Sequence, residues 1–479
     1  MKVSIIDIVE GITLANFDTY CNSYMRYADK NKPLFEDKLS LELGNILLNF
    51  GQEVIRPPMY YKQKILTNKT FKMFNDIHKY FKNKNMFIDS GGFQILKGYV
   101  PKEYMVHLID MYIDFLRICK ENNMENLYYF YLDINPIKEI SPEYSISHMM
   151  KFQNLLEEMD KDNWIRNKMY IIHHCNTPLS YHTFTKFFNE NNIIERIGSH
   201  RYAVGGMVPL NFNSVRLQIK TYLYPLFEVI EKEREYLENG GHVHYHVLGM
   251  SGLSDEFLLI WCMLYFKMIG WNLHISFDST TALFKATQSN TLYHVKDNDI
   301  TIINTKYENI KNKPDCKKPN VLTNGEYIED IINFINGNIH PKEKNKVDTL
   351  EKCFTKNTND KINSSHAFRY MMIIYNFWSY SQIFNIFKNS AFEIPEIITD
   401  HTGTTRYNHM MDLVTKFKFI KNMKSYKIKT YKSLNNSLEY LMAYIEKRIK
   451  IDQIRNMCLE DTVENIKKLS FNDLIKIDE

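Results

Sequence analysis

Short apolar runs and longer amphipathic stretches alternate along most of this chain. The runs are rich in β-branched and aromatic residues, which predicts strands, and the stretches between them repeat apolar positions at helical spacing. The predicted helices include Lys102–Cys119, Tyr144–Glu158 and Asp255–Met268. Strands alternating with helices in this way predict an α/β fold, a (β/α)8 TIM barrel with parallel strands. The predicted strands are Gly44–Leu48, Met86–Ile88, Leu127–Leu132, Met169–His173, Tyr202–Val204, His244–Leu248, Leu273–Phe277 and Ile300–Asn304.

The alternating pattern ends near residue 305. From about residue 306 to 365 the chain is polar and punctuated by Pro and Gly, which predicts an insertion near the last strand. The amphipathic segment His366–Phe387 then predicts a last barrel helix. We therefore expect a barrel domain over residues 1–390 and a mainly helical, lysine-rich C-terminal extension over residues 391–479, which ends in the amphipathic pattern Ile454–Ile475.

Composition is typical of a folded protein from a reducing compartment. Hydrophobic residues make up 44% of the chain and charged residues 24%, and no stretch is long and apolar enough to span a bilayer. The N-terminal sequence MKVSIIDIVEGITL carries acids too early for a secretory signal. The 7 cysteines, an odd number spread over the whole length, do not form a disulfide pattern. These features predict a cytoplasmic protein that does not enter a membrane.

Charge is distributed unevenly, although the net charge is only +4. Residues 416–432 contain no acid, and Phe417, Phe419, Tyr426 and Tyr431 interleave the lysines. Such a pattern predicts a surface that follows nucleic-acid phosphates and stacks on bases, while a solvated face in a lysine-rich protein explains the run as well. The lysines are Lys416, Lys418, Lys421, Lys424, Lys427, Lys429 and Lys432.

Acidic, histidine and glycine residues stand at the carboxyl ends of the predicted strands. The sequence DSGGFQ, residues 89–94, directly follows the run Met86–Ile88, and its two glycines let a flat ligand approach the backbone. In a (β/α)8 barrel the reacting groups gather at this end of the strands. Taken singly, a glycine there is usually a turn and an aspartate is often a helix N-cap. The other strand ends carry Asp133, His173, His174, Gly205, Gly206, Gly249 and Asp278.

Together these motifs resemble the tRNA-guanine transglycosylases, and in particular their relatives that place 7-deazaguanine bases in DNA. The resemblance spans roughly residues 45 to 380, and the last hundred residues have no counterpart in it. LLNFGQEVIRP and ITIINTKYENIKNKPDC are weaker matches. The motifs that carry it are DSGGFQ at 89–94, YFYLDINP at 129–136, AVGGM at 203–207, HVLGMSG at 246–252 and ISFDS at 275–279.

The resemblance implies a catalytic role for two carboxylates. Exchange of a base breaks the bond between C1′ and the base nitrogen through an oxocarbenium-like transition state. A carboxylate can trap this cation covalently while a second carboxyl group moves the proton. Asp278 is then the nucleophile, and Asp89 is the general acid and base for the departing guanine and the incoming 7-deazaguanine. No ATP or redox cofactor is needed.

Base recognition is implied for a further set of residues. Asp133 would accept hydrogen bonds from N1–H and the exocyclic amine of guanine, although the alternative is that Asp133 caps the turn at Asn135–Pro136. His174 stands where the family has a glutamine that touches the base. The alternating histidines of residues 242–246 suggest a strand with a surface face rather than a metal site. The O6 edge would be met by Ser90, Gly205, Gly206 and Met207, and the alternative for the glycines is a tight strand exit.

The zinc signature of the tRNA enzymes, C-x-C-x-x-C followed by a histidine that starts a helix, is eroded in this sequence. Cys316 and His366 are the only well-placed ligands, and Cys353 or His340 would have to complete them. We therefore expect no metal and no other cofactor.

The active-site motifs do not separate a DNA substrate from tRNA. The eroded zinc motif, the replaced glutamine and the lysine-rich tract favour DNA. The Lys, Asn and Ile usage suggests an AT-rich genome. The resemblance implies a phage-encoded protein in a host cytoplasm, because the DNA-modifying relatives are often encoded by phages. We expect the chain to bind DNA and a free 7-deazaguanine such as preQ0, and to form a homodimer or bind partner proteins. Lys416, Lys418, Lys421 and Lys424 would hold the nucleic-acid backbone. A divergent tRNA-guanine transglycosylase and an inactive partner subunit are the alternatives.

Overall fold

The computed structural model describes part of the 479-residue chain. The described residues are 12–14, 45–50, 78, 85–92, 105–134, 142–174, 178–205, 221–249, 258–259, 262–263, 265–266, 269–279, 291–296, 299–304, 333, 375–376, 379 and 428–456.

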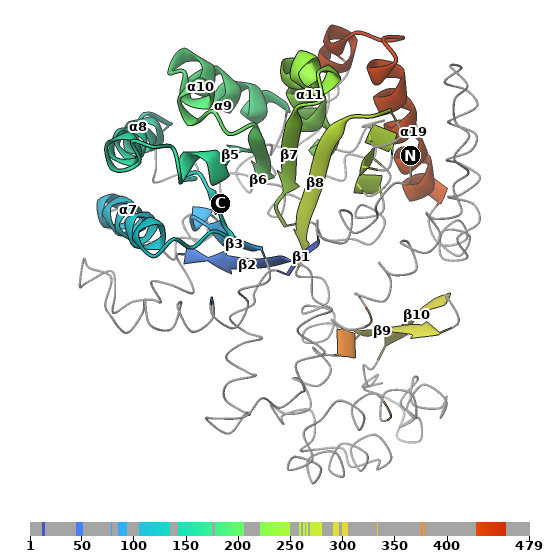
Figure 1. The fold of residues 1–479 in the computed structure, drawn as a ribbon. Helices are drawn as coiled ribbons and strands as arrows, with labels where there is room; N and C mark the ends of the chain where they lie inside the picture. Colours follow the sequence, from blue (N-terminus) through green and yellow to red (C-terminus); the bar gives the residue numbers. More distant parts are fainter. Residues whose placement is uncertain are drawn as a thin grey trace, which may run out of the picture.

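A curled parallel sheet lies at the centre of the fold (Figure 1). Each strand pairs in parallel with the next one in chain order, and β1 also pairs with β8 through residues 12–14. Parallel neighbours require long crossover connections, and between β3 and β7 the intervening helices supply them. The mixed α/β class predicted from the sequence is therefore confirmed. The strands are β1 Ile12–Leu14, β2 Asn45–Asn49, β3 Met86–Asp89, β4 Leu127–Phe130, β5 Met169–His174, β6 Arg201–Gly205, β7 His242–Val247 and β8 Asn272–Ser279.

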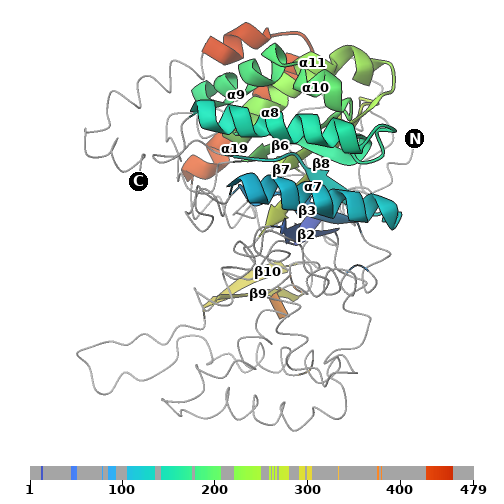
Figure 2. The same ribbon diagram turned by 90° about the vertical axis from the view of Figure 1, so that its left-hand side faces the viewer.

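Helices cover the outer face of this sheet (Figures 1 and 2). Helix α7 shows why they form, because its buried positions recur at helical spacing and Tyr112 donates a hydrogen bond of 2.8 Å to the carbonyl of Phe130 on β4. Among the described residues, no helix is both long enough and apolar enough to cross a bilayer. The helices are α7 Met105–Glu121, α8 Pro142–Met159, α9 Pro178–Glu190, α10 Ile193–Ile197 and α11 Tyr224–Glu238.

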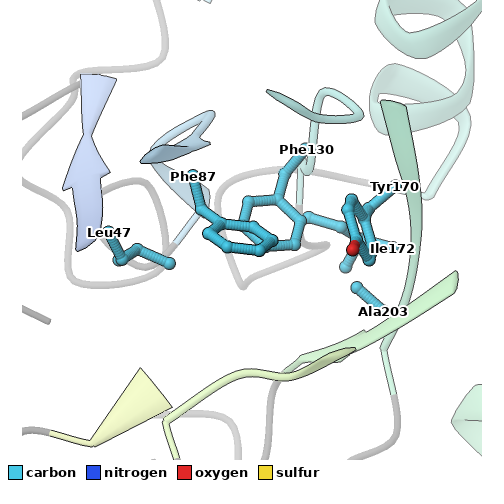
Figure 3. Packing of buried hydrophobic residues seen from close by; sticks show 6 residues of the cluster. All are labelled: Leu47, Phe87, Phe130, Tyr170, Ile172 and Ala203. Atoms are coloured by element: carbon cyan, nitrogen blue, oxygen red, sulfur yellow. The ribbon is translucent and has the colours of Figure 1, made fainter. Parts of the chain in front are cut away.

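The inner face of the curled sheet is filled with large side chains. Figure 3 shows Leu47, Phe87, Phe130, Tyr170, Ile172 and Ala203 gathered there, each no more than 6% exposed. The rings of Phe87 and Phe130 stack with their centroids 6.0 Å apart. A strand buried on one face by helices and on the other by this interior carries a near-continuous apolar run, as the sequence pattern predicted.

One of the eight predicted strands is placed wrongly. Residues 300–304 do form a strand, β10 Asp299–Asn304, but it pairs antiparallel with β9 Thr291–Lys296 in a separate two-stranded sheet. Figures 1 and 2 show this hairpin apart from the curled sheet. Only two residues separate the strands, too few for the crossover that a parallel pairing needs. The remaining strand of the curled sheet is β1, which pairs with β2 and β8 and was not predicted from the sequence.

The C-terminal helix α19, Ile428–Ile445, packs against α11. Arg234 of α11 donates to the carbonyl oxygens of Ile445 and Tyr444, at 3.3 and 3.4 Å, which satisfies acceptors at the end of α19. Arg455 forms a two-pronged ion pair with Glu228, at 2.6 and 2.8 Å. Residues 428–445 of the predicted extension are thus helical. The boundary near residue 390 and most of the insertion at 306–365 lie outside the described residues and stay predictions.

Candidate active site at the carboxyl ends of the strands

Asp278 lies near the end of β8 and is 4% exposed. Its Oδ1 accepts a hydrogen bond of 2.8 Å from the backbone N–H of Gly249, and Nε2 of His246 lies 3.4 Å from the same oxygen. Gly249 has a φ of 72°, a left-handed conformation that glycine adopts without strain. The glycine after β7 thus aims its amide at the carboxylate on the neighbouring strand.

Asp89 is the last residue of β3 and is 8% exposed. The backbone N–H of Gly91 lies 3.4 Å from Oδ1 of Asp89, and Gly91 has a φ of 100°, which only glycine adopts readily. Tyr112 on α7 has a raised pKa, mainly because it is buried and then because of the nearby negative charge of Asp89. The carboxylate therefore sits at the strand end with a glycine turn folded around it.

Asp133, three residues beyond β4, is 6% exposed and contacts the DSGG turn. Its backbone N–H donates a hydrogen bond of 3.2 Å to Oγ of Ser90, which is fully buried. A Cβ built on Gly92 would lie 2.1 Å from Oδ2 of Asp133 and 2.9 Å from its carbonyl oxygen. Asp133 thus occupies the space that a side chain at position 92 would take, so the second glycine of the turn exists for this close approach.

We expect Gly92→Ala to lower the free energy of unfolding by about 1–3 kcal/mol, because the new methyl group overpacks the contact with Asp133. Urea denaturation measures the change. Asp133→Ala removes the carboxylate, so in the double variant the alanine at position 92 should cost less than it does alone. Gly92 does not have a positive φ, so the cost of its substitution reports the contact rather than backbone strain. Equal costs of Gly92→Ala with and without Asp133 would contradict the contact.

His246 was interpreted from the sequence as part of a strand with a surface face, and this is wrong. The strand is present as β7, but His246 is fully buried. Its Nδ1 lies 2.7 Å from Oγ of Ser276, and its ring stacks on Phe87 with centroids 5.3 Å apart. The histidines alternate with Val243, Tyr245 and Val247 along the strand, and alternation alone does not show which face of a strand is buried.

Of the two neighbouring histidines of β5, the structure describes the side chain of His173 but not that of His174. His173 is 2% exposed and faces α9, where its Nδ1 lies 3.4 Å from Oγ1 of Thr185 and its ring packs on Phe188. It is therefore part of the packing between strand and helix. The side chain of His174 lies outside the described residues, so its predicted contact with the base stays a prediction.

Several predicted site residues lie outside the described part of the chain. Gly205 ends β6 and is buried, so it stands at the predicted strand end. No group of three or more His, Cys, Asp or Glu residues suited to a metal occurs among the described residues. Outside them are Gly206, Met207, the lysines Lys416, Lys418, Lys421 and Lys424, and the zinc-ligand candidates Cys316, His340, Cys353 and His366.

The structure thus brings together buried polar groups from four strands. Asp89 and Ser90 come from the end of β3, Asp133 from the end of β4, His246 from β7 and Asp278 from β8. Carboxylates at the carboxyl ends of parallel strands can serve as nucleophile, acid and base toward a ligand bound over that edge. Comparison with protein-family models and with curated proteins finds no match for this chain. Its chemistry is therefore inferred from these side chains.

Proposed function

We propose that this chain is a transglycosylase that exchanges guanine in DNA for a 7-deazaguanine base such as preQ0, on a complete (β/α)8 barrel. The observation that carries the proposal is the set of three buried carboxylates, Asp89, Asp133 and Asp278, at the carboxyl ends of β3, β4 and β8. Base exchange through a covalent intermediate needs one group that attacks the sugar and one that moves the proton, and a third carboxylate can recognise the base.

Asp278 is the nucleophile of the proposed reaction. Its contacts with Gly249 and His246 both end on Oδ1, which leaves Oδ2 as the oxygen that attacks C1′. The bond from C1′ to N9 of guanine breaks as the bond from C1′ to Oδ2 forms, and Asp89 gives a proton to the departing base. Asp89 then takes the N9 proton of the incoming 7-deazaguanine, whose N9 displaces the carboxylate from C1′.

Asp133 is the base-recognising group. A carboxylate accepts two parallel hydrogen bonds from N1–H and the exocyclic amine of guanine or 7-deazaguanine, a pair of donors that adenine, cytosine and thymine do not present together. The bond from the Asp133 amide to Ser90 ties this group to the turn that carries Asp89. Recognition and proton transfer are thereby held in one rigid unit. The product is retained because carbon in place of N7 makes 7-deazaguanine a poorer leaving group.

The test is incorporation of radiolabelled guanine by the purified full-length chain. We expect label in DNA, with single-stranded DNA supplied beside duplex because flipping a base out of a duplex costs a few kcal/mol. Unmodified tRNA is the parallel substrate, and the RNA enzyme should need the 2′-hydroxyl that deoxyribose lacks. Label in tRNA alone would make the DNA assignment wrong and favour the tRNA enzyme. Label in none of the three polymers would contradict base exchange and favour the inactive-subunit alternative.

A further inference from the structure

Basic side chains stand directly opposite one another at the amino ends of three neighbouring strands. Arg201, the first residue of β6, lies in register with His244 on β7, and His244 lies in register with His274 on β8. The imidazoles of His244 and His274 stack with their centroids 5.1 Å apart and an interplanar angle of 19°. His242, the first residue of β7, also stacks on His274, with centroids 6.1 Å apart and an angle of 12°. We call His242, His244 and His274 the histidine cluster.

The histidine cluster lies at the end of β7 and β8 that is opposite the candidate active site. His246 and Asp278 stand further along the same two strands, toward their carboxyl ends. His244 is partly buried, and its ring meets the ring of Tyr170 on β5 nearly edge on, with centroids 6.4 Å apart and an interplanar angle of 74°. The cluster therefore packs against the aromatic interior shown in Figure 3, to which Tyr170 belongs.

Arg201 adds a permanent positive charge beside the cluster, because a guanidinium stays protonated in proteins. Its Nε donates a hydrogen bond of 3.1 Å to the carbonyl of Asn167, and its Nη1 lies 3.4 Å from the hydroxyl of Tyr170. The guanidinium also lies over the ring of Tyr128, 4.9 Å from the centroid. None of these contacts brings a formal negative charge to Arg201. Like charges at directly opposite positions of neighbouring strands destabilise a sheet, so a proton on His244 would repel Arg201.

We propose that the histidine cluster is an acid-sensitive clamp on the amino ends of β7 and β8. While the rings are neutral, they stack and hold the two strands together. A proton on His244 sets two positive charges opposite each other and opens this end of the strand pair. The clamp is a property of the fold and does not rest on the proposed function.

The surroundings of His244 set the direction of the pH dependence. The groups that face it are Arg201 on β6, Tyr170 on β5, His274 on β8 and His242 on its own strand. Burial first, then the charge of Arg201 and then the other two histidines lower the pKa of His244 well below its usual value. In the open state the imidazole meets water and regains its ordinary pKa of about 6.5. Between these two pKa values the open state binds one more proton, so the closed state is most stable above about pH 6.5 and loses stability as the pH falls.

The test is amide hydrogen exchange of the full-length chain at about pH 7.5 and about pH 5.5, a range above the ordinary pKa values of carboxylates. Exchange rates corrected for the intrinsic effect of pH report local opening. We expect the protection of β7 and β8 to fall about tenfold at the lower pH, the change that one proton taken up at an ordinary histidine produces. Helix α8, which carries no residue of the cluster, is the internal reference and should keep its protection.

Three variants separate the clamp from general loss of packing. His244→Phe keeps a ring that cannot take up a proton, so the protection of β7 and β8 should change less than about twofold between the two pH values. Arg201→Gln removes the opposing charge, so the fall should be smaller than in the wild type. His148→Phe is the matched control, because His148 is a histidine of α8 that stacks on Tyr144 with centroids 3.9 Å apart, and this variant should show the wild-type fall.

The wild type alone can overturn the proposal. Protection of β7 and β8 that is the same at both pH values would do so, and no variant has to fold for this result. An equal fall in His244→Phe and the wild type would also overturn it. A fall of the same size in α8 would show that acid opens the whole fold rather than this end of the sheet. Because none of these measurements uses guanine incorporation, the clamp and the proposed function fail separately.

Discussion

Asp278→Ala should abolish base exchange, with a loss of roughly 10⁴- to 10⁶-fold in kcat, because the reaction then has no group to trap the sugar cation. Asp278→Asn should be nearly as damaging. The amide keeps the size of the carboxylate and can still accept from the Gly249 N–H, so the surroundings of a residue that is 4% exposed change little. What the amide lacks is the negative charge that forms the bond to C1′.

Two measurements check this expectation. Guanine incorporation gives the rate, and a denaturing gel with end-labelled DNA shows the covalent adduct, which should form with the wild type and vanish in both variants. Asp110→Asn is the matched control, because Asp110 is an exposed aspartate of α7 that forms an ion pair with Lys151 at 3.0 Å, away from the strand ends. A covalent adduct with Asp278→Asn, or exchange near the wild-type rate, would show that another group is the nucleophile.

Asp89→Asn should lower exchange of guanine roughly 10²- to 10⁴-fold, the range expected when a general acid and base is lost. The glycine turn around position 89 accepts an amide of the same shape, since the Gly91 N–H still finds an oxygen there. The fold and the nucleophile therefore stay in place, and only proton transfer is removed.

A change of leaving group separates this role from a structural one. 7-Methylguanine carries a positive charge in DNA and departs as a neutral base, so it needs no proton from Asp89. Asp89→Asn should therefore release 7-methylguanine at close to the wild-type rate while guanine release remains slow. Asp278→Ala should release neither base by attack on C1′. An equal loss for both leaving groups in Asp89→Asn would contradict the acid role of Asp89.

The sheet was largely predictable because seven of the eight expected strands coincide with strands of the curled sheet. Their apolar runs are bounded by helical stretches, and this pattern is sufficient to identify a buried parallel strand. Two strand predictions failed, each for a physical reason. The strand Ile12–Leu14 has three residues, too few for any periodicity to emerge. Residues 300–304 have the composition of a strand, but the two-residue connection to the preceding run is the mark of a hairpin.

The strand-end positions of the candidate residues were predictable, whereas their contacts were not. Asp89, Asp133 and Asp278 were identified by their places at strand ends, and the structure has all three buried there. The contact that excludes a side chain at Gly92 involves a residue 41 positions away, and sequence alone does not measure such a distance. His246 was misjudged because alternation shows that a strand has two faces, but not which of the two meets water.

The contact between α19 and α11 has a consequence for synthesis of the protein on the ribosome. Arg455 follows its partner Glu228 by 227 residues. Translation adds roughly 5–20 residues per second, so the face of α11 that α19 covers stays uncovered for on the order of ten to fifty seconds after α11 is made. During that interval Phe227, whose ring packs on Tyr444 with centroids 5.4 Å apart, has no helix over it. The nascent chain therefore presents a temporary apolar strip on its outer layer, a surface that chaperones recognise, until residues 428–455 have left the ribosome.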